Sequence, residues 1–230
     1  MMADSDYPLN VHPLHPDAVA ERAARERKSA IADRKRELMS QRHYLEDLDE
    51  FYDPGFMIEG VLAPGGFSVM YGGSNVGKTF VALDMAIHIA DGREWMGHEV
   101  NPAWVLYIAA EGGMGFRNRL AAIKRAKPEL NENAGIRFSY LAGRIDLSSE
   151  FDPQVIKTML GDEGPKLIVI DTLARSMGNG DENSTKDMNA MVEAVDEIRG
   201  DGTEAHVLVV HHSGKNEQLG ARGSSVLRAA

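Results

Sequence analysis

The sequence has no cysteine among its 230 residues, which excludes disulfide bonds and zinc sites built on cysteine. It also has no apolar run that approaches the roughly 18 residues needed to span a membrane. Its first residues lack the basic and then apolar layout of a signal peptide. These absences predict a protein that is not inserted in a membrane and that works in a reducing compartment. We expect it in the cytoplasm.

Positive charge is scarce as well, and it is unevenly distributed. The net charge is −10, yet residues 21–42 contain eight Lys and Arg against four Asp and Glu. An acidic bulk argues against a surface that binds nucleic acid over its whole extent. A narrow basic channel needs only a few cations per subunit, so composition leaves DNA binding open.

The first part of the chain has too few apolar residues to build a core. Residues 1–17 are rich in proline and predict a flexible tail, in which His12 and His15 are solvated. Residues 18–52 are strong helix formers with dense mixed charge and predict a charged helical arm. Three interpretations of this arm stay open. It can be a solvated helix with i,i+4 charge pairs, a helix that packs on a neighbouring subunit, or a basic region that binds DNA.

Residues 53–230 alternate short apolar runs with helical patterns, which predicts one α/β domain. The runs 167–170 and 207–210 are continuously apolar, which indicates burial on both faces of a parallel sheet. We therefore expect a wound, mainly parallel sheet flanked by helices. The expected strands are 66–71, 104–109, 136–140, 166–170 and 205–210, and the expected helices are 78–90, 115–126, 153–160 and 186–199.

The strongest motif is a glycine-rich loop of the form G-x-x-x-x-G-K-[ST] between a strand pattern and a helix pattern. Its glycines let the backbone turn tightly and bring N–H groups onto a phosphate, while the following helix adds the positive end of its dipole. Lys78 is expected to reach the β- and γ-phosphates, and the Thr79 hydroxyl to take one position on Mg²⁺. The motif predicts binding of ATP with Mg²⁺. It consists of Gly72, Gly73, Ser74, Asn75, Val76, Gly77, Lys78 and Thr79.

Two carboxylates follow predicted strands, at the edge where a parallel sheet binds its ligands. Asp171 ends the run 167–170, and we expect it to hold Mg²⁺ directly or through water. Glu111 follows the run 105–109 and precedes two glycines. It can orient and deprotonate the water that attacks the γ-phosphate, or it can be an acid favoured by the dipole of the next helix. We favour the catalytic interpretation.

His211 and His212 follow the last apolar run. Because neighbouring residues of a strand face opposite ways, only one of them can point at the γ-phosphate. An imidazole there can sense whether the γ-phosphate is present and move the loop that follows. The alternative is a simple hydrogen bond at the end of a strand. A shared metal ion is a poor alternative, since adjacent strand residues seldom chelate one ion.

Two loops at the same edge differ in charge. Residues 177–185 are acidic and rich in turn formers, so they suit a phosphate backbone poorly. Residues 213–228 are basic and carry Lys215, Arg222 and Arg228. These cations are candidates for contacts with DNA phosphates or with a nucleotide bound by a neighbouring subunit.

Taken together, these motifs resemble the RecA-like superfamily of AAA-type ATPases, and most closely its RepA-like branch of phage and plasmid replicative helicases. The resemblance covers about residues 54–230. The matching stretches are 72–79, 95–97, 106–113, 119–120, 167–175, 181–184, 209–215 and 222–225.

The resemblance implies that Glu111 is the water-activating glutamate, that Asp171 is the metal-associated aspartate, and that His211 and His212 form the γ-phosphate sensor region. It also implies a homo-oligomeric ring, a hexamer, with ATP sites between subunits and single-stranded DNA moving through the centre. From it we expect a DNA helicase of phage or plasmid replication. The alternatives are a RecA-like regulatory switch and a DNA repair or recombination ATPase without processive unwinding.

The chain departs from this family at its C-terminus, because the family continues into further strands. The arginine that such rings supply in trans usually lies in that region, and it contributes about 10³–10⁵ in rate. We therefore expect a C-terminally truncated sequence that binds Mg·ATP and hydrolyses it feebly.

Overall fold

The computed structural model describes residues 16–42, 44–47, 55–110, 112–131, 134–143, 145–160, 164–199 and 205–212. The chain divides into two units, Met1–Asp53 and Pro54–Ala230, each of which is described by itself. Most of the expected N-terminal tail, residues 1–15, lies outside the described residues.

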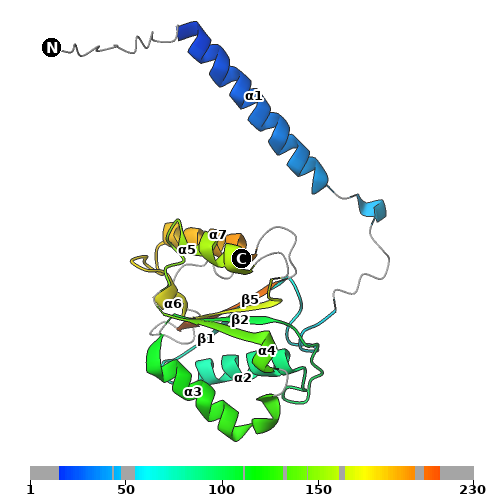
Figure 1. Ribbon diagram of the computed structural model, residues 1–230, viewed down its shortest axis with the longest axis vertical. Coiled ribbons are helices and arrows are strands. Elements are labelled where there is room, and N and C mark those ends of the chain that lie inside the picture. Colours follow the sequence, from blue (N-terminus) through cyan, green and yellow to red (C-terminus); the bar gives the residue numbers. More distant parts are fainter. Residues whose placement is uncertain are drawn as a thin grey trace, which may run out of the picture. The chain divides into compact units, whose positions relative to one another are not determined.

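The first unit contains the long helix α1, Pro16–Ser40, and a short 3-10 helix η1, Leu45–Asp47 (Figure 1). The helix begins two residues earlier than expected, because proline fits the first helical position and Asp17 complements the dipole. It ends at Ser40, within the expected arm of residues 18–52, and its last turn carries no basic residue. Every described side chain of α1 is exposed, and i,i+4 pairs such as Arg22–Glu26 at 2.8 Å connect its charges. No described helix of the protein is both long and apolar enough to cross a membrane.

The second unit is built on a five-stranded sheet in which every neighbouring pair is parallel. The α/β fold with a wound parallel sheet is thereby confirmed. The strands lie in the order β1-β5-β4-β2-β3. Their bounds are β1 Phe67–Gly72, β2 Val105–Ala109, β3 Phe138–Ala142, β4 Leu167–Asp171 and β5 His206–His212.

Helices cover both faces of the sheet, and the direction of each crossover decides which face (Figure 1). The chain moves from β1 towards β3 first and then returns through β4 to β5. Because parallel crossovers are right-handed, connections in opposite directions place their helices on opposite faces. One face carries α2 Lys78–Asp91, α3 Gly113–Ala126, η2 Pro128–Asn131 and α4 Ala134–Arg137; the other carries α5 Asp152–Leu160, α6 Leu173–Ser176 and α7 Thr185–Arg199.

Alternating strand residues pack into two separate hydrophobic cores, one on each face of the sheet. In β4, Leu167 and Val169 pack on the α2 side, whereas Ile168 and Ile170 pack on the α7 side. Since both faces are buried, the strand sequence is continuously apolar instead of alternating. The two faces are called the α2 face and the α7 face below.

The expected strands and helices of the sheet domain agree with the observed ones to within two residues at each end. The expected strand 136–140 begins at Phe138, because the short helix α4 occupies Ala134–Arg137. The helical turn α6 was not expected, since four residues are too few for a periodic pattern.

Candidate nucleotide-binding site

The glycine-rich loop connects the end of β1 to the start of α2. Gly77 is the N-cap of α2 with φ 94°, and Asn75 has φ 62°, so both adopt the left-handed conformation. A side chain at Gly77 would be strained there, whereas asparagine tolerates this region better than most residues. The motif positions at which the sequence has Gly and Asn therefore match the backbone that the loop adopts.

The loop and its lysine have the chemistry that a phosphate group requires. The N-terminus of α2 has no side-chain cap, which leaves its first amides directed out of the helix. Lys78 Nζ donates to the carbonyl oxygens of Gly72 at 2.9 Å and Gly73 at 2.7 Å, so the ammonium group lies against the loop. The residues present fit a bound phosphate.

Asp171 ends β4 at the same edge of the sheet and on the same face as α2, since it follows the alternation of Leu167 and Val169. Its side chain is buried, and the hydroxyl of Tyr107 donates a hydrogen bond to Asp171 Oδ2 at 2.7 Å. Thr79 stands in the first turn of α2 and is half-buried. The structure thus brings Lys78, Thr79 and Asp171 to one edge and one face.

The register of β5 separates the two histidines. Val207 and Val209 pack on the α7 side, so His211 lies on the α7 face, where it is fully buried. His212 follows Leu208 and Val210 on the α2 face, and it is the register partner of Gly72 in the glycine-rich loop. Of the two, His212 shares the face of Asp171.

Four of the expected site residues, Glu111, Lys215, Arg222 and Arg228, lie outside the described residues. The neighbours of Glu111 are described. The amide of Ala110 donates to the carbonyl oxygen of Asp171 at 2.8 Å, so the chain leaves β2 beside the end of β4.

Tyr107 contacts the candidate site residue Asp171, and the sequence analysis missed it. It lies in the middle of β2, is fully buried, and packs its ring on Phe116 with centroids 5.2 Å apart. A phenolic hydroxyl inside an otherwise apolar strand needs a polar partner. That requirement is the signal from which a contact with a strand-end carboxylate could have been inferred.

Comparison with known families adds to this geometry. A model of the AAA domain family matches residues 46–218, which is most of the chain. The chain belongs to the AAA domain family. Membership supports a P-loop ATPase and implies that the domain binds nucleotide. No curated protein matched the chain significantly.

In this AAA domain, two carboxylate side chains of helix α2 bind the helix to its surroundings. Asp84 accepts hydrogen bonds from Trp95 Nε1 at 3.1 Å and from Lys127 Nζ at 2.6 Å. Asp91 is buried and accepts from Arg93 Nε at 2.7 Å and from the amide of Ala134. These bonds fix the helix whose first turn carries Lys78 and Thr79.

The AAA domain also has a histidine at the opposite edge of the sheet. His206 begins β5, where its ring contacts the Ser68 hydroxyl and the carbonyl oxygen of Ala63. Burial lowers the pKa of His206 below its ordinary value of 6.5, the hydrogen bond to Ala63 opposes this shift, and the charge of Arg199 adds to it. A neutral ring donates from Nδ1 to Ala63 and accepts at Nε2 from Ser68. This histidine supports the fold and is remote from the phosphate loop.

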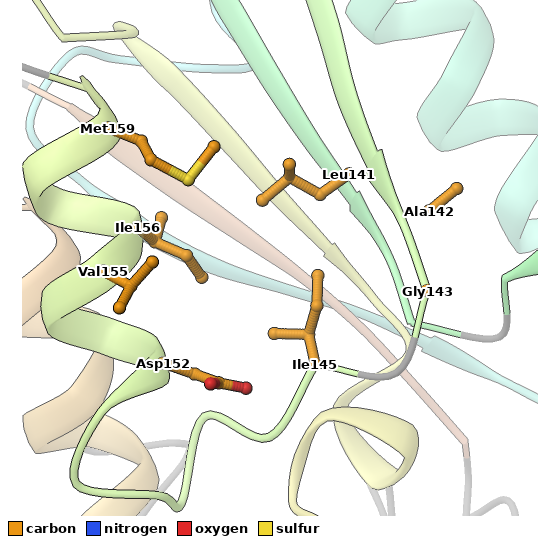
Figure 2. A pocket seen from close by; sticks show the side chains of 8 residues that line it. All are labelled: Leu141, Ala142, Gly143, Ile145, Asp152, Val155, Ile156 and Met159. Atoms are coloured by element: carbon orange, nitrogen blue, oxygen red, sulfur yellow. The ribbon is translucent and has the colours of Figure 1, made fainter.

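Two hollows lined by described residues lie near the β3 side of the sheet. The first, of about 280 Å³, is mostly apolar and lies between β3 and α5 (Figure 2). Figure 2 shows Leu141, Ile145 and Ile156 directed into it. The second, of about 480 Å³, opens at the carboxyl ends of β2, β3 and β4. Among the described residues there is no group of three or more His, Asp or Glu suited to a metal ion, so Mg²⁺ would need phosphate oxygens to complete its ligands.

Proposed function

We propose that this chain is the ATPase domain of a RepA-like DNA helicase or translocase of phage or plasmid replication. ATP would bind at the glycine-rich loop and be hydrolysed at subunit interfaces of a homo-oligomeric ring, a hexamer, through which single-stranded DNA moves. The observation that carries the proposal is the meeting of Lys78, Thr79 and Asp171 at the carboxyl edge of the sheet, on the α2 face.

Each residue has a role that follows from its place. Lys78 turns from the loop carbonyls to the β- and γ-phosphates, and the loop amides hold the remaining phosphate oxygens. Thr79 and Asp171 would hold Mg²⁺, which would supply positive charge beside the phosphates. Tyr107 keeps the Asp171 carboxylate in one orientation.

Glu111 and His212 complete this assignment. Glu111 orients and deprotonates the attacking water. His212 is the γ-phosphate sensor, since it is the histidine on the face of Asp171. The loop after β5, with Lys215 and Arg222, would transmit the change to DNA or to a neighbouring subunit.

A second candidate is a RecA-like ATPase that regulates a protein partner or acts in repair or recombination without processive unwinding. The net charge of −10 favours it, because an acidic protein attracts nucleic acid only through a local basic site.

ATP binding and hydrolysis, measured with and without single-stranded DNA, test the proposal. Lys78→Ala is expected to lose ATP binding, and Glu111→Gln to bind ATP with hydrolysis lowered at least about 100-fold. Lys186→Ala, an exposed lysine of α7, is the matched control and is expected to behave like the wild type. Displacement of a paired strand should accompany hydrolysis.

Wild-type turnover in Glu111→Gln would remove this residue from the mechanism. Hydrolysis that is indifferent to DNA, without strand displacement, would favour the regulatory ATPase instead.

A further inference from the structure

The larger hollow is formed by three loops that leave the sheet at its carboxyl edge. Ala110 and Gly112 follow β2, Gly143 and Ile145 follow β3, and Arg175 lies in α6 after β4. Its volume of about 480 Å³ is within the roughly 300–1,000 Å³ of small-ligand sites. It is therefore large enough for a phosphate with an attached sugar.

The topology of the sheet explains why a hollow forms there. The connection after β2 goes to the α2 face, whereas the connections after β3 and β4 go to the α7 face. When the connections after neighbouring strands go to opposite faces of the sheet, a crevice opens between them. Open α/β sheets bind ligands in such crevices.

This crevice is separate from the glycine-rich loop. The loop follows β1, and β5 and β4 lie between β1 and β2. The hollow begins at the residues that follow β4, two strand spacings from β1, which amount to about 10 Å. The crevice is a second place at the same edge.

The chemistry of the hollow suits an anion. Arg175 is exposed, and within the described part of the chain its guanidinium makes no hydrogen bond or ion pair. Three glycines line the hollow, at positions 112, 143 and 178, and they allow close approach to the backbone. Asp146 lies against Gly178, and its Oδ1 accepts hydrogen bonds from the amide and hydroxyl of Ser148, which offset part of its charge.

We propose that this hollow holds one phosphodiester group of single-stranded DNA, with Arg175 as its cation. The inference rests on the proposed function and adds a contact site to it. Among the described residues that line the hollow none is aromatic, so we expect no base stacking there and binding that is independent of sequence.

The contact also connects DNA to hydrolysis. Gly112 lines the hollow and is the residue after Glu111. The preceding residue, Ala110, is hydrogen-bonded to the backbone of Asp171. Occupation of the hollow therefore acts on the segment that positions the water-activating carboxylate.

Arg175→Gln tests this contact, with Arg125→Gln as the matched control. Arg125 is an exposed arginine in the last turn of α3, at the amino edge of the sheet. Binding of a fluorescein-labelled oligo(dT) is measured by anisotropy over a range of salt concentrations, with a non-hydrolysable ATP analogue present. We expect Arg175→Gln to weaken binding about tenfold, as for the loss of one charge-assisted contact. Its salt slope should become shallower by about 0.7.

Further readouts separate a contact from a structural role. Arg175→Lys should keep most of the affinity, and Arg125→Gln should change it less than twofold. Half-maximal stimulation of hydrolysis should need more oligo(dT) in Arg175→Gln than in the wild type or in Arg125→Gln.

Two outcomes overturn the inference, and they are distinguishable. If the wild type binds oligo(dT) and Arg175→Gln binds it with the same affinity and slope, the contact is wrong and the proposed function stands. If dTMP binds with the same dependence on Arg175 while oligo(dT) does not bind, the hollow is a mononucleotide site. The helicase proposal then fails with the inference, although ATP binding through Lys78 would persist.

Discussion

The hydroxyl of Tyr107 donates a 2.7 Å hydrogen bond to Asp171 Oδ2 between neighbouring strands, and both side chains are buried. The two residues lie on the same face because β2 and β4 are parallel and in register, with Tyr107 opposite Val169. The bond joins the aromatic cluster of Tyr107, Phe116 and Phe138 to the carboxylate that we assign to Mg²⁺. Packing of the core thereby sets the orientation of a site residue.

Tyr107→Phe tests the importance of this bond. Removing the donor should lower the free energy of unfolding by about 1.5–3 kcal/mol, because the acceptor is a charged group. It should also raise the Mg²⁺ concentration needed for half-maximal hydrolysis several-fold. Tyr140→Phe is the matched control, since Tyr140 is partly exposed on β3 and makes no described hydrogen bond. Equal effects of the two variants would contradict a role for the bond.

Replacing each of the two histidines at the end of β5 by alanine should have a different effect: one should lower hydrolysis and the other should lower stability. His212→Ala is expected to lower DNA-stimulated hydrolysis at least about tenfold, with a small loss of stability because the side chain is only half-buried. His211→Ala should instead cost about 1–3 kcal/mol of stability, since it empties a fully buried position. Hydrolysis and denaturant unfolding measure the two effects. The reverse pattern would assign the sensor to His211.

Gly66→Ala should destabilise the sheet domain through a steric clash. A Cβ at this position would lie 2.7 Å from Nδ1 and 2.9 Å from Cε1 of His206, closer than such atoms approach. The ring cannot move freely, because it is held between Ser68 and Ala63. We expect a loss of about 1–3 kcal/mol in denaturant unfolding. Gly135→Ala is the control, since nothing lies within 4 Å of its Cβ.

Stability should fall as pH is lowered below about 6.5, in part because of His206. The folded protein keeps this ring neutral at pH values where the unfolded chain already binds a proton, so acid favours the unfolded state. The loss begins near the ordinary pKa of 6.5 and ends at the lowered folded pKa. Its slope is at most about 1.4 kcal/mol per pH unit. His206→Gln should be less stable at neutral pH and should lack this part of the slope. Identical slopes for the two proteins would contradict the assignment.

The strands and main helices of the sheet domain could be predicted from sequence because apolar runs and glycine positions are local signals. Strand order could not, since pairs such as Phe67 with Val207 join residues far apart in the chain. Among the strands only β3 is displaced by two residues at both ends, and it is an edge strand, whose residues are partly exposed and carry a weaker pattern.

The candidate site likewise has residues that local sequence could predict and contacts that it could not. The glycine-rich loop was predicted from its spacing and Asp171 from its place after an apolar run, and their position at one edge follows from the parallel sheet. The choice between His211 and His212 required the register of β5 on β1. The contact of Tyr107 with Asp171 required the order of the strands, because the two residues are 64 positions apart.

The exposure of the described side chains of helix α1 has a practical consequence for spectroscopy. Its 25 residues contribute to far-ultraviolet circular dichroism, yet its described side chains are all exposed, so it should melt gradually as an isolated helix does. Both tryptophans, Trp95 and Trp104, lie in the sheet domain, and Trp95 is buried. Intrinsic fluorescence will therefore follow the cooperative transition of the sheet domain, whereas ellipticity at 222 nm will mix two processes and yield no single midpoint.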